Sequence, residues 1–468
     1  MLKNHMKYRN QFLALFILII LPATGILLSH CSKDNPVDTP PGETGPVPEN
    51  VSFAFINTNV VPMDVEGIIE NQTVIIRDGN ISEIVPAGTY SFPDTIPQID
   101  GSGRYLMPGL ADMHAHLTNA DQSKNDLLLY IANGVTTIRL MWGFTRYLNW
   151  RDQVENGTLI GPRIYSASPG FEGRSTGFSG SVLFNTPEQA RQAVIIQKNR
   201  GFDFIKMFNG LTLAEYRAIT EEAQAQDIKV IGHVPFAFNI DQVVASPVPQ
   251  DCIEHLRGYA RLATSTGSWA TGTINETTLM RLAEDTRDAG IWHCPTITVD
   301  SRMRSQVPGL SNVPELRFVS PALLNWLQQP VTQPPNFDSR VSDTNRKRAV
   351  KIFHDAGVRL LLGTDGAFFW VLPGFGIHEE LANFVDAGLT PFQALKTSTV
   401  NAADFLETSD QTGSVTVGKQ ADLILLDGNP LQGVANLKQR AGVMVRGQWF
   451  SEETLQEMLE QLARSYGN

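Results

Sequence analysis

The chain has 468 residues, which is too long for one small domain and long enough for a barrel with an accessory domain. Hydrophobic residues make up 42% of the sequence and charged residues 18%, as in ordinary globular enzymes. The formal net charge is −11, and no cluster of Lys and Arg offers a phosphate-binding stripe, so we expect no nucleic-acid partner.

The first 50 residues have the features of an export signal followed by a tether. A positively charged start precedes an apolar run over residues 12–28, and Cys31 follows closely. This resembles a bacterial lipoprotein signal peptide, in which the cysteine becomes the lipidated first residue. We expect a signal peptide over residues 1–30 and a Pro/Gly-rich disordered tether over residues 31–50. Ser32 favours the outer membrane, with the protein facing the periplasm or the cell surface and touching the membrane only through its lipid. A membrane-spanning anchor and an ordinary cleaved signal are the alternatives.

Strand-like segments occur at both ends of the remaining chain. The sequence Asp78-Gly79-Asn80 favours a hairpin turn between two of them, and two more lie after residue 420. These segments have no helical partners and bracket a repeat of strands and helices. We therefore predict that residues 51–105 and 408–455 form one small β-sandwich domain built from both chain ends.

Strand-like and helical stretches alternate over residues 106–407. Three helices begin with the capping pattern S/T-x-x-E/Q, at Thr186, Thr212 and Thr390. Eight strands are predicted at Leu110–His116, Val135–Leu140, Arg163–Ala167, Phe204–Met207, Lys229–His233, Cys252–His255, His293–Thr298 and Arg359–Thr364. This alternation predicts an α/β fold with a (β/α)8 TIM-type barrel.

Two further features bear on this fold. An open doubly wound sheet is the alternative, but no Gly-rich phosphate loop follows the first strand. The long, Pro-rich segment over residues 302–345 is interpreted as an insertion after strand seven that could cap the site.

Chemically active side chains gather where the predicted strands end, which is where barrel enzymes carry their active sites. His114 and His116 are two residues apart on strand one and therefore point the same way. Each such residue has an ordinary structural explanation when taken alone, but the whole set is hard to explain structurally. Imidazole and carboxylate together suit Zn²⁺ and similar cations, so we predict a metal site. Its residues are His114, His116, Lys206, His233, His255 and Asp365.

Six motifs together resemble the amidohydrolase superfamily of metal-dependent hydrolases, and they are most similar to its imidazolonepropionase-like and prolidase-like branch. The motifs are MPGLADMHAH at 107–116, FIK at 204–206, GHVP at 232–235, IEHL at 253–256, GTDG at 363–366 and KQADLILLDGNP at 419–430. The resemblance covers about residues 51–450 and implies a metal-dependent hydrolase.

The resemblance implies a role for each predicted ligand. His114, His116 and Asp365 would hold one divalent metal ion, and two further histidines, His233 and His255, would hold a second. Lys206, carboxylated by CO2, would bridge the two ions, for which Zn²⁺ is the expected metal. Such a pair of ions lowers the pKa of a bridging water and gives hydroxide near neutral pH. Asp365 would take the proton and pass it to the leaving nitrogen.

We expect hydrolysis of a C–N bond in a small substrate, such as a dipeptide, a cyclic amide or an N-acyl amino acid. Arg139, Arg174, His293 and His378 are the candidate substrate contacts, with ordinary loop or helix-cap bonding as the alternative. Guanidinium holds a carboxylate by two parallel hydrogen bonds, so the two arginines favour a substrate with a free carboxylate.

Two other functions remain open. A lactonase or esterase could use the same hydroxide, whereas a non-catalytic surface-binding lipoprotein would carry a degenerate site, against which the complete ligand set argues. Cys252 and Cys294 could form a disulfide in an oxidising compartment or remain buried thiols.

Overall fold

The computed structural model describes residues 51–174, 180–304, 313–328 and 339–467, all within one compact unit. The predicted signal peptide, the lipidation site Cys31 and the tether lie outside the described residues, as does part of the predicted insertion. Within the described part of the chain, no helix has the length and apolar character needed to cross a membrane.

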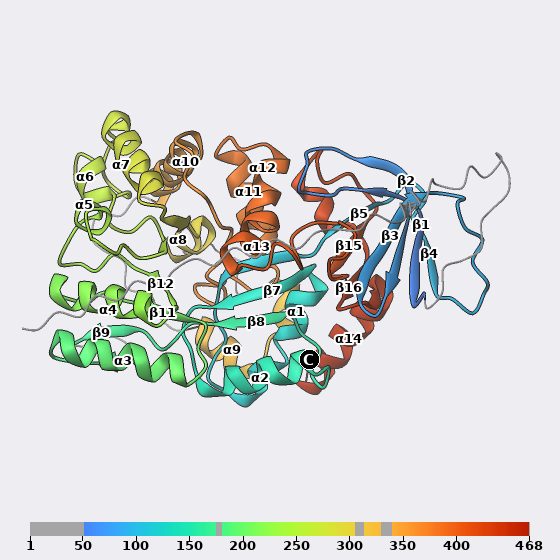
Figure 1. Ribbon diagram of the computed structural model, residues 1–468, viewed down its shortest axis with the longest axis horizontal. Coiled ribbons are helices and arrows are strands. Elements are labelled where there is room, and N and C mark those ends of the chain that lie inside the picture. The colour runs from blue at the N-terminus through green and yellow to red at the C-terminus, as the bar shows by residue number, and fades with distance from the viewer. Residues whose placement is uncertain (1–50, 175–179, 305–312, 329–338, 468) are drawn as a thin grey trace, which may run out of the picture. The chain divides into compact units, whose positions relative to one another are not determined.

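Both chain ends contribute to one mixed sheet of eight strands (Figure 1). Its order is β17-β16-β15-β5-β1-β2-β3, with β4 pairing β1. The two ends are joined by antiparallel pairing of β15 with β5, which runs from Leu423 opposite Pro108 to Leu426 opposite Tyr105. The bounds are β1 Phe53–Val60, β2 Ile69–Arg77, β3 Asn80–Pro86, β4 Gln98–Asp100, β5 Tyr105–Pro108, β15 Leu423–Leu426, β16 Arg440–Val445 and β17 Gln448–Ser451.

The expected β-sandwich is not shown, because the pairing places these strands in one sheet. Successive side chains of β16 point to opposite faces of the sheet, and both faces are buried. Met444 belongs to an apolar cluster within the sheet, whereas Val443 and Val445 pack with Leu455 of helix α14 (Glu452–Ser465). The helix α14, which the sequence reading did not predict, therefore covers part of the face that a second sheet would have covered.

Parallel strands occupy the middle of the described chain. One sheet contains β6 Leu110–Ala115, β7 Val135–Leu140 and β8 Arg163–Ser166. The other, in the order β10-β9-β11-β12-β13-β14, contains β9 Phe171–Gly173, β10 Val182–Leu183, β11 Phe204–Met207, β12 Lys229–Gly232, β13 Cys252–Glu254 and β14 Trp292–Cys294. Every pairing in these two sheets is parallel, so the fold is α/β with parallel sheets.

Isolated parallel bridges continue the pairing beyond the two sheets. Ala167 pairs with Phe204, which brings the end of β8 beside β11. Residues 359–364, predicted as strand eight, form no regular strand, but Leu360 bridges to His293, and Gly366, two residues beyond the predicted end, bridges to Ala115. This segment is therefore paired with β14 on one side and with β6 on the other. A closed barrel stays a prediction.

Helices follow most of the parallel strands (Figure 1). The capping patterns at Thr212 and Thr390 form complete capping boxes. The pattern at Thr186 is incomplete: the Thr186 side chain caps the helix, but the Gln189 side chain accepts from the backbone N–H of Asn185 and not from that of Thr186. The helices are α1 Leu127–Ala132, α2 Thr145–Glu155, α3 Pro187–Asn199, α4 Leu213–Ala225, α5 Ile240–Val244, α6 Ala260–Ala263, α7 Glu276–Asp288, α8 Ile297–Arg304, α9 Pro321–Leu327, α10 Ser339–Asp355, α11 Gly376–Asp386, α12 Pro391–Thr397, α13 Val400–Leu406 and α14, with 3-10 turns at Asp121–Lys124, Pro314–Phe318 and Val434–Lys438.

Strand seven is shorter than predicted. It ends at Cys294 rather than Thr298, because α8 begins at Ile297. Thr296 has a positive φ of 50°, so the chain turns sharply between the strand and the helix.

Candidate active site

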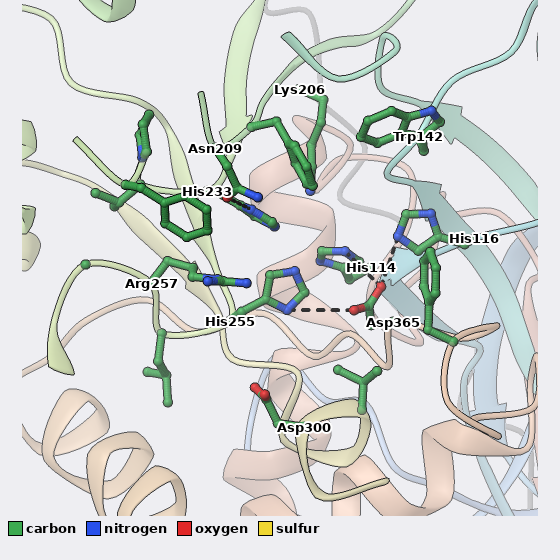
Figure 2. Close-up of a pocket in the computed structure, with 18 of the residues that line it drawn as sticks. His114, His116, Trp142, Lys206, Asn209, His233, His255, Arg257, Asp300 and Asp365 are labelled. Carbon is green, nitrogen blue, oxygen red and sulfur yellow. Dashed lines mark hydrogen bonds and ion pairs between the residues drawn. The ribbon is translucent and has the colours of Figure 1, made fainter. Parts of the chain in front are cut away.

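All six predicted metal ligands line one pocket with a volume of about 1020 Å³ (Figure 2). They lie at or just beyond the carboxyl ends of parallel strands and of the paired segment 359–366, where the strands of such sheets present their active sites. Positive φ angles of 61° at His255 and 57° at Asp365 show that two of them sit on strained backbone, as residues at functional sites often do.

Asp365 is the residue on which three of the four histidines converge (Figure 2). Its Oδ1 lies 2.9 Å from Nε2 of His116 and 3.3 Å from Nε2 of His114, and its Oδ2 lies 3.8 Å from Nδ1 of His255. The ring centroids of His233 and His255 are 4.9 Å apart, which extends the cluster toward Lys206.

Neighbouring polar groups hold three of the imidazoles in place. Nδ1 of His114 lies 2.7 Å from Glu254 Oε2, and Nδ1 of His233 lies 2.8 Å from Asn209 Oδ1. The third ring is hydrogen-bonded to a hydroxyl: Nδ1 of His255 lies 2.6 Å from Thr296 Oγ1. In metal sites such partners fix the tautomer and the ring orientation, which leaves Nε2 of His114 and His233 for an ion.

A buried ion pair lies beneath the site. The Arg139 guanidinium donates from Nη2 to Glu254 Oε1 over 2.8 Å and lies over the ring of Phe405, 5.1 Å from its centroid. Arg139 and Glu254 are both fully buried, and Glu254 reaches His114 with its other oxygen. Arg139 therefore supports the His114 ring through Glu254. It does not line the pocket, contrary to the expectation that it contacts substrate.

The other three candidate substrate contacts also lie away from the pocket lining, although all are in the described part of the chain. Arg174 is exposed and donates to the Asn185 carbonyl over 3.2 Å. His293 is buried against the rings of Tyr259 and Phe353. Another buried imidazole, His378 of α11, bonds through Nε2 to Asn133 Oδ1 over 3.1 Å. Their side chains thus serve packing and local bonding.

Burial and charge set the protonation of the site. Burial lowers the pKa of His116 to about 4 and the pKa of Lys206 to about 8. For Asp365, burial acts to raise the pKa, but the charge of His114 and hydrogen bonds from His114 and His116 outweigh it and hold the pKa well below its usual value. Burial and the charges of Lys206 and other neighbours hold the pKa of His233 well below normal. For His114, burial acts to lower the pKa, but the charges of Asp365 and Glu254 outweigh it and raise the pKa. The neutral imidazoles of His116 and His233 beside an ionised carboxylate are in the forms that bind divalent metals.

The donor set fits a divalent cation. His114, His116 and Asp365 each offer one ligand atom, and these atoms lie within 4.8 Å of one another. The backbone beside them has no room for a larger residue: a Cβ at Gly363 would lie 2.6 Å from both Cβ of His114 and Sγ of Cys294. Glycine at this position therefore lets the segment carrying Asp365 pack closely against His114.

Comparison with known proteins decides the family. Residues 105–450, about three quarters of the chain, match the amidohydrolase family. The chain belongs to the amidohydrolase family. Among relatives, ochratoxinase from Aspergillus niger is 26% identical over 394 residues, covering 70% of this chain and 71% of that protein. Imidazolonepropionase from Shewanella baltica (strain OS185) is 22% identical, covering 80% and 92%. A solved structure of a Xaa-Pro dipeptidase with bound methionine is 18% identical, with a TM-score of 0.65 and coverage of 85% and 99%, and this likeness shows the fold.

The resemblance inferred from the sequence motifs is therefore confirmed: the chain is an amidohydrolase and a hydrolase acting on carbon–nitrogen bonds, and its relatives are consistent with the imidazolonepropionase-like and prolidase-like branch. Its two cysteines outside the N-terminal 50 residues, Cys252 and Cys294, are buried free thiols. The structure thus favours buried thiols over a disulfide between them.

The walls of this amidohydrolase's pocket contain residues that were not among the predicted ligands or substrate contacts. The aromatic ones include Trp142, Phe208, Phe236, Trp269, Trp326 and Phe368. Trp326 comes from α9, so the described part of the predicted insertion does reach the pocket.

Three arginines and one aspartate supply charge to the walls. Arg346 is paired with Asp300, Nη1 to Oδ2 at 2.5 Å, and also bonds to the His255 carbonyl. Arg261 donates to the Phe236 carbonyl, and Arg257 lies two residues after His255. The rule that loops after barrel strands carry active sites could have identified Arg257, whereas Arg346, on a helix distant in sequence, gave no such signal.

Proposed function

We propose that this hydrolase cleaves an amide or peptide bond of a small substrate and uses two divalent metal ions held by the predicted ligand set. The observation that carries the proposal is the convergence of the six residues on one pocket of about 1020 Å³. Relatives named as an ochratoxinase, an imidazolonepropionase and a Xaa-Pro dipeptidase are consistent with chemistry at a C–N bond.

The proposed ligand roles follow the arrangement of the side chains. His114 and His116 would hold one ion with Asp365, with which they are in contact, while His233 and His255, whose rings lie together, would hold the other. The resemblance of the motifs to the family supports a carboxylated Lys206 between them, and the burial of this lysine in the pocket wall agrees with that role. When bound, two such ions polarise the scissile carbonyl and acidify a water molecule, and Zn²⁺ is the metal we propose.

Asp365 is the proposed proton carrier. It is ionised in this environment, so it can accept the proton of the attacking water and deliver it to the leaving nitrogen. The imidazoles of His114, His233 and His255 are already oriented by Glu254, Asn209 and Thr296. Burial holds the pKa of His233 and the pKa of His255 well below the usual value, which fits these two rings as ligands rather than as acids.

The fold and the location are also proposed. The parallel bridges that pair residues 359–366 with both β14 and β6 support an eight-membered ring of strands, and we propose that it is a closed (β/α)8 barrel. The apolar run before Cys31 supports a lipid anchor, and we propose that it holds the enzyme at the outer membrane.

A hydrolysis screen tests the proposed reaction. Metal-loaded protein should hydrolyse members of a panel of dipeptides and N-acyl amino acids, and His233→Asn should abolish this activity. His354→Asn is the matched control, because His354 lies on α10 and does not line the pocket. Turnover of lactones without turnover of amides would favour the esterase alternative, and binding without turnover of either class would favour a binding protein.

A further inference from the structure

A slip in the strand pairing lies directly beside Asp365. Before the slip, the N–H of Met113 on β6 donates to the Leu362 carbonyl over 2.9 Å, whereas after it the N–H of Asp365 donates to the His114 carbonyl over 2.7 Å. The N–H of Thr364, which comes between these two bonds, turns instead to a side chain of β6. Irregular strand pairing next to an active site re-aims a side chain, and here that side chain is the proposed metal ligand Asp365.

The side chain that receives Thr364 is the carboxylate of Asp112, which is fully buried two residues before His114. Its Oδ1 accepts the N–H of Thr364 over 3.0 Å and the N–H of His114 over 3.2 Å. Its Oδ2 accepts the Thr364 hydroxyl over 2.6 Å. One carboxylate therefore ties the backbone that carries His114 to the backbone that carries Asp365.

The Thr364 hydroxyl extends this connection past Asp365. Its oxygen donates to Asp112 and accepts the N–H of Gly366 over 3.0 Å, so the residues on both sides of Asp365 are held. Asp365 itself has a φ of 57°, in the left-handed region that residues other than glycine rarely adopt. Such strained backbone persists where the surrounding structure fixes it from several directions. We call the hydrogen-bonded chain from Asp112 through Thr364 to Gly366 the Asp365 bracket.

We infer that Asp112 and Thr364 are positioning residues, which set the backbone of Asp365 through the Asp365 bracket so that its carboxylate reaches the ion held with His114 and His116. Neither Asp112 nor Thr364 lines the pocket, so both act through Asp365 and not on the substrate. The inference deepens the proposed function and rests on it, because it requires that Asp365 binds an ion.

Withdrawal of zinc from the metal-loaded enzyme by a competing chelator tests the inference without measuring turnover. Thr364→Val replaces the hydroxyl with a methyl group of nearly the same shape. It should weaken one ion by about 10- to 100-fold, the effect of losing a group that orients a metal ligand, and should affect the ion held by His233 and His255 less. Thr364→Ser keeps the hydroxyl and should bind both ions as tightly as the unsubstituted enzyme, which a role in packing alone does not predict.

A second variant and a control complete the test. Asp112→Asn breaks the same bracket from its other side, and combining it with Thr364→Val should add little further loss, because two changes in one hydrogen-bonded chain are not additive. Thr286→Val on α7 is the matched control. The Thr286 hydroxyl is also buried and is hydrogen-bonded to the Tyr259 hydroxyl and the Leu282 carbonyl, but it lies away from the pocket lining. This control should leave the zinc affinity unchanged.

The outcomes separate the inference from the proposed function. Unchanged affinity for both ions in Thr364→Val and in Asp112→Asn would overturn the inference, and so would equal losses in Thr364→Val and Thr364→Ser. A loss of the same size in Thr286→Val would also overturn it, because the effect would then belong to any buried hydroxyl. The predicted affinity pattern in an enzyme that hydrolyses none of the amides would support the Asp365 bracket while contradicting the proposed reaction.

Discussion

Replacing Glu254 with glutamine should weaken both the fold and the metal site. Glu254 is fully buried and uses its two oxygens to bond Arg139 over 2.8 Å and His114 over 2.7 Å. Both partners are donors when His114 binds an ion through Nε2, whereas a glutamine side chain offers only one acceptor oxygen. The substituted side chain would therefore lose one of these bonds and leave the Arg139 charge uncompensated.

The magnitude follows from the burial of the pair. Breaking a buried ion pair by neutralising one partner costs about 3–5 kcal/mol of folding free energy. Removing the partner that orients a metal-binding imidazole lowers metal affinity by about 10- to 100-fold. We therefore expect Glu254→Gln to shift the urea unfolding midpoint of the metal-free protein strongly downward and to weaken metal binding in the same range.

Two titrations on the same preparations measure these effects: urea unfolding followed by circular dichroism, and metal binding against a competing chelator. Glu276→Gln is the matched control, because Glu276 is also bonded to an arginine, Arg348, but is exposed. It should change neither measurement appreciably. An unchanged midpoint together with unchanged metal affinity in Glu254→Gln would refute the role assigned to this buried network.

Three further predictions concern other residues. Asp365→Asn should retain substantial metal but lower kcat by about 100-fold or more, the scale for losing a general acid–base group, and a near-normal rate would assign proton transfer to another residue. Asp126 is buried beneath Ser320, which donates to it from its backbone N–H and its hydroxyl, and burial raises the pKa of Asp126 to about 7. Because the folded state then keeps a proton that the unfolded chain releases, the free energy of unfolding should fall as pH rises from about 4 to 7; Asp126→Asn should remove that component, and identical pH profiles would contradict it. Cys31→Ser should release the protein from membranes in fractionation, and retention would indicate that the apolar run over residues 12–28 is an uncleaved anchor.

The predicted metal ligands share a pocket for a reason that is visible in the sequence. Each lies at or near a strand end, and the carboxyl ends of parallel strands meet at one edge. The position of Arg139 was not visible in this way. Its partner Glu254 ends β13 and directly precedes His255, and of these two residues only His255 lines the pocket. Arg139 on β7 and Glu254 on β13 belong to different sheets, so only the packing of the two sheets brings them together.

The fold at the chain ends shows a similar limit. The sequence predicted strands at both chain ends. It did not predict whether they form one sheet or two, because that depends on which elements cover the faces of the strands. Helix α14 provides part of that cover, and its signal was present in the spacing by four of the buried Leu455, Leu459 and Ala463 after the capping Ser451. Strand seven was extended too far because the apolar, β-branched residues after Cys294 suit a strand, although they form the start of α8.

The central claim is that two ions held by this ligand set are needed for hydrolysis. The most direct test is to titrate Zn²⁺ into the metal-free enzyme and follow, in the same samples, bound metal by elemental analysis and hydrolysis of an amide substrate found in the screen. Activity should rise to its maximum only as the bound metal approaches two ions per chain. Full activity at one ion per chain would contradict the two-metal account and remove the bridging role proposed for Lys206.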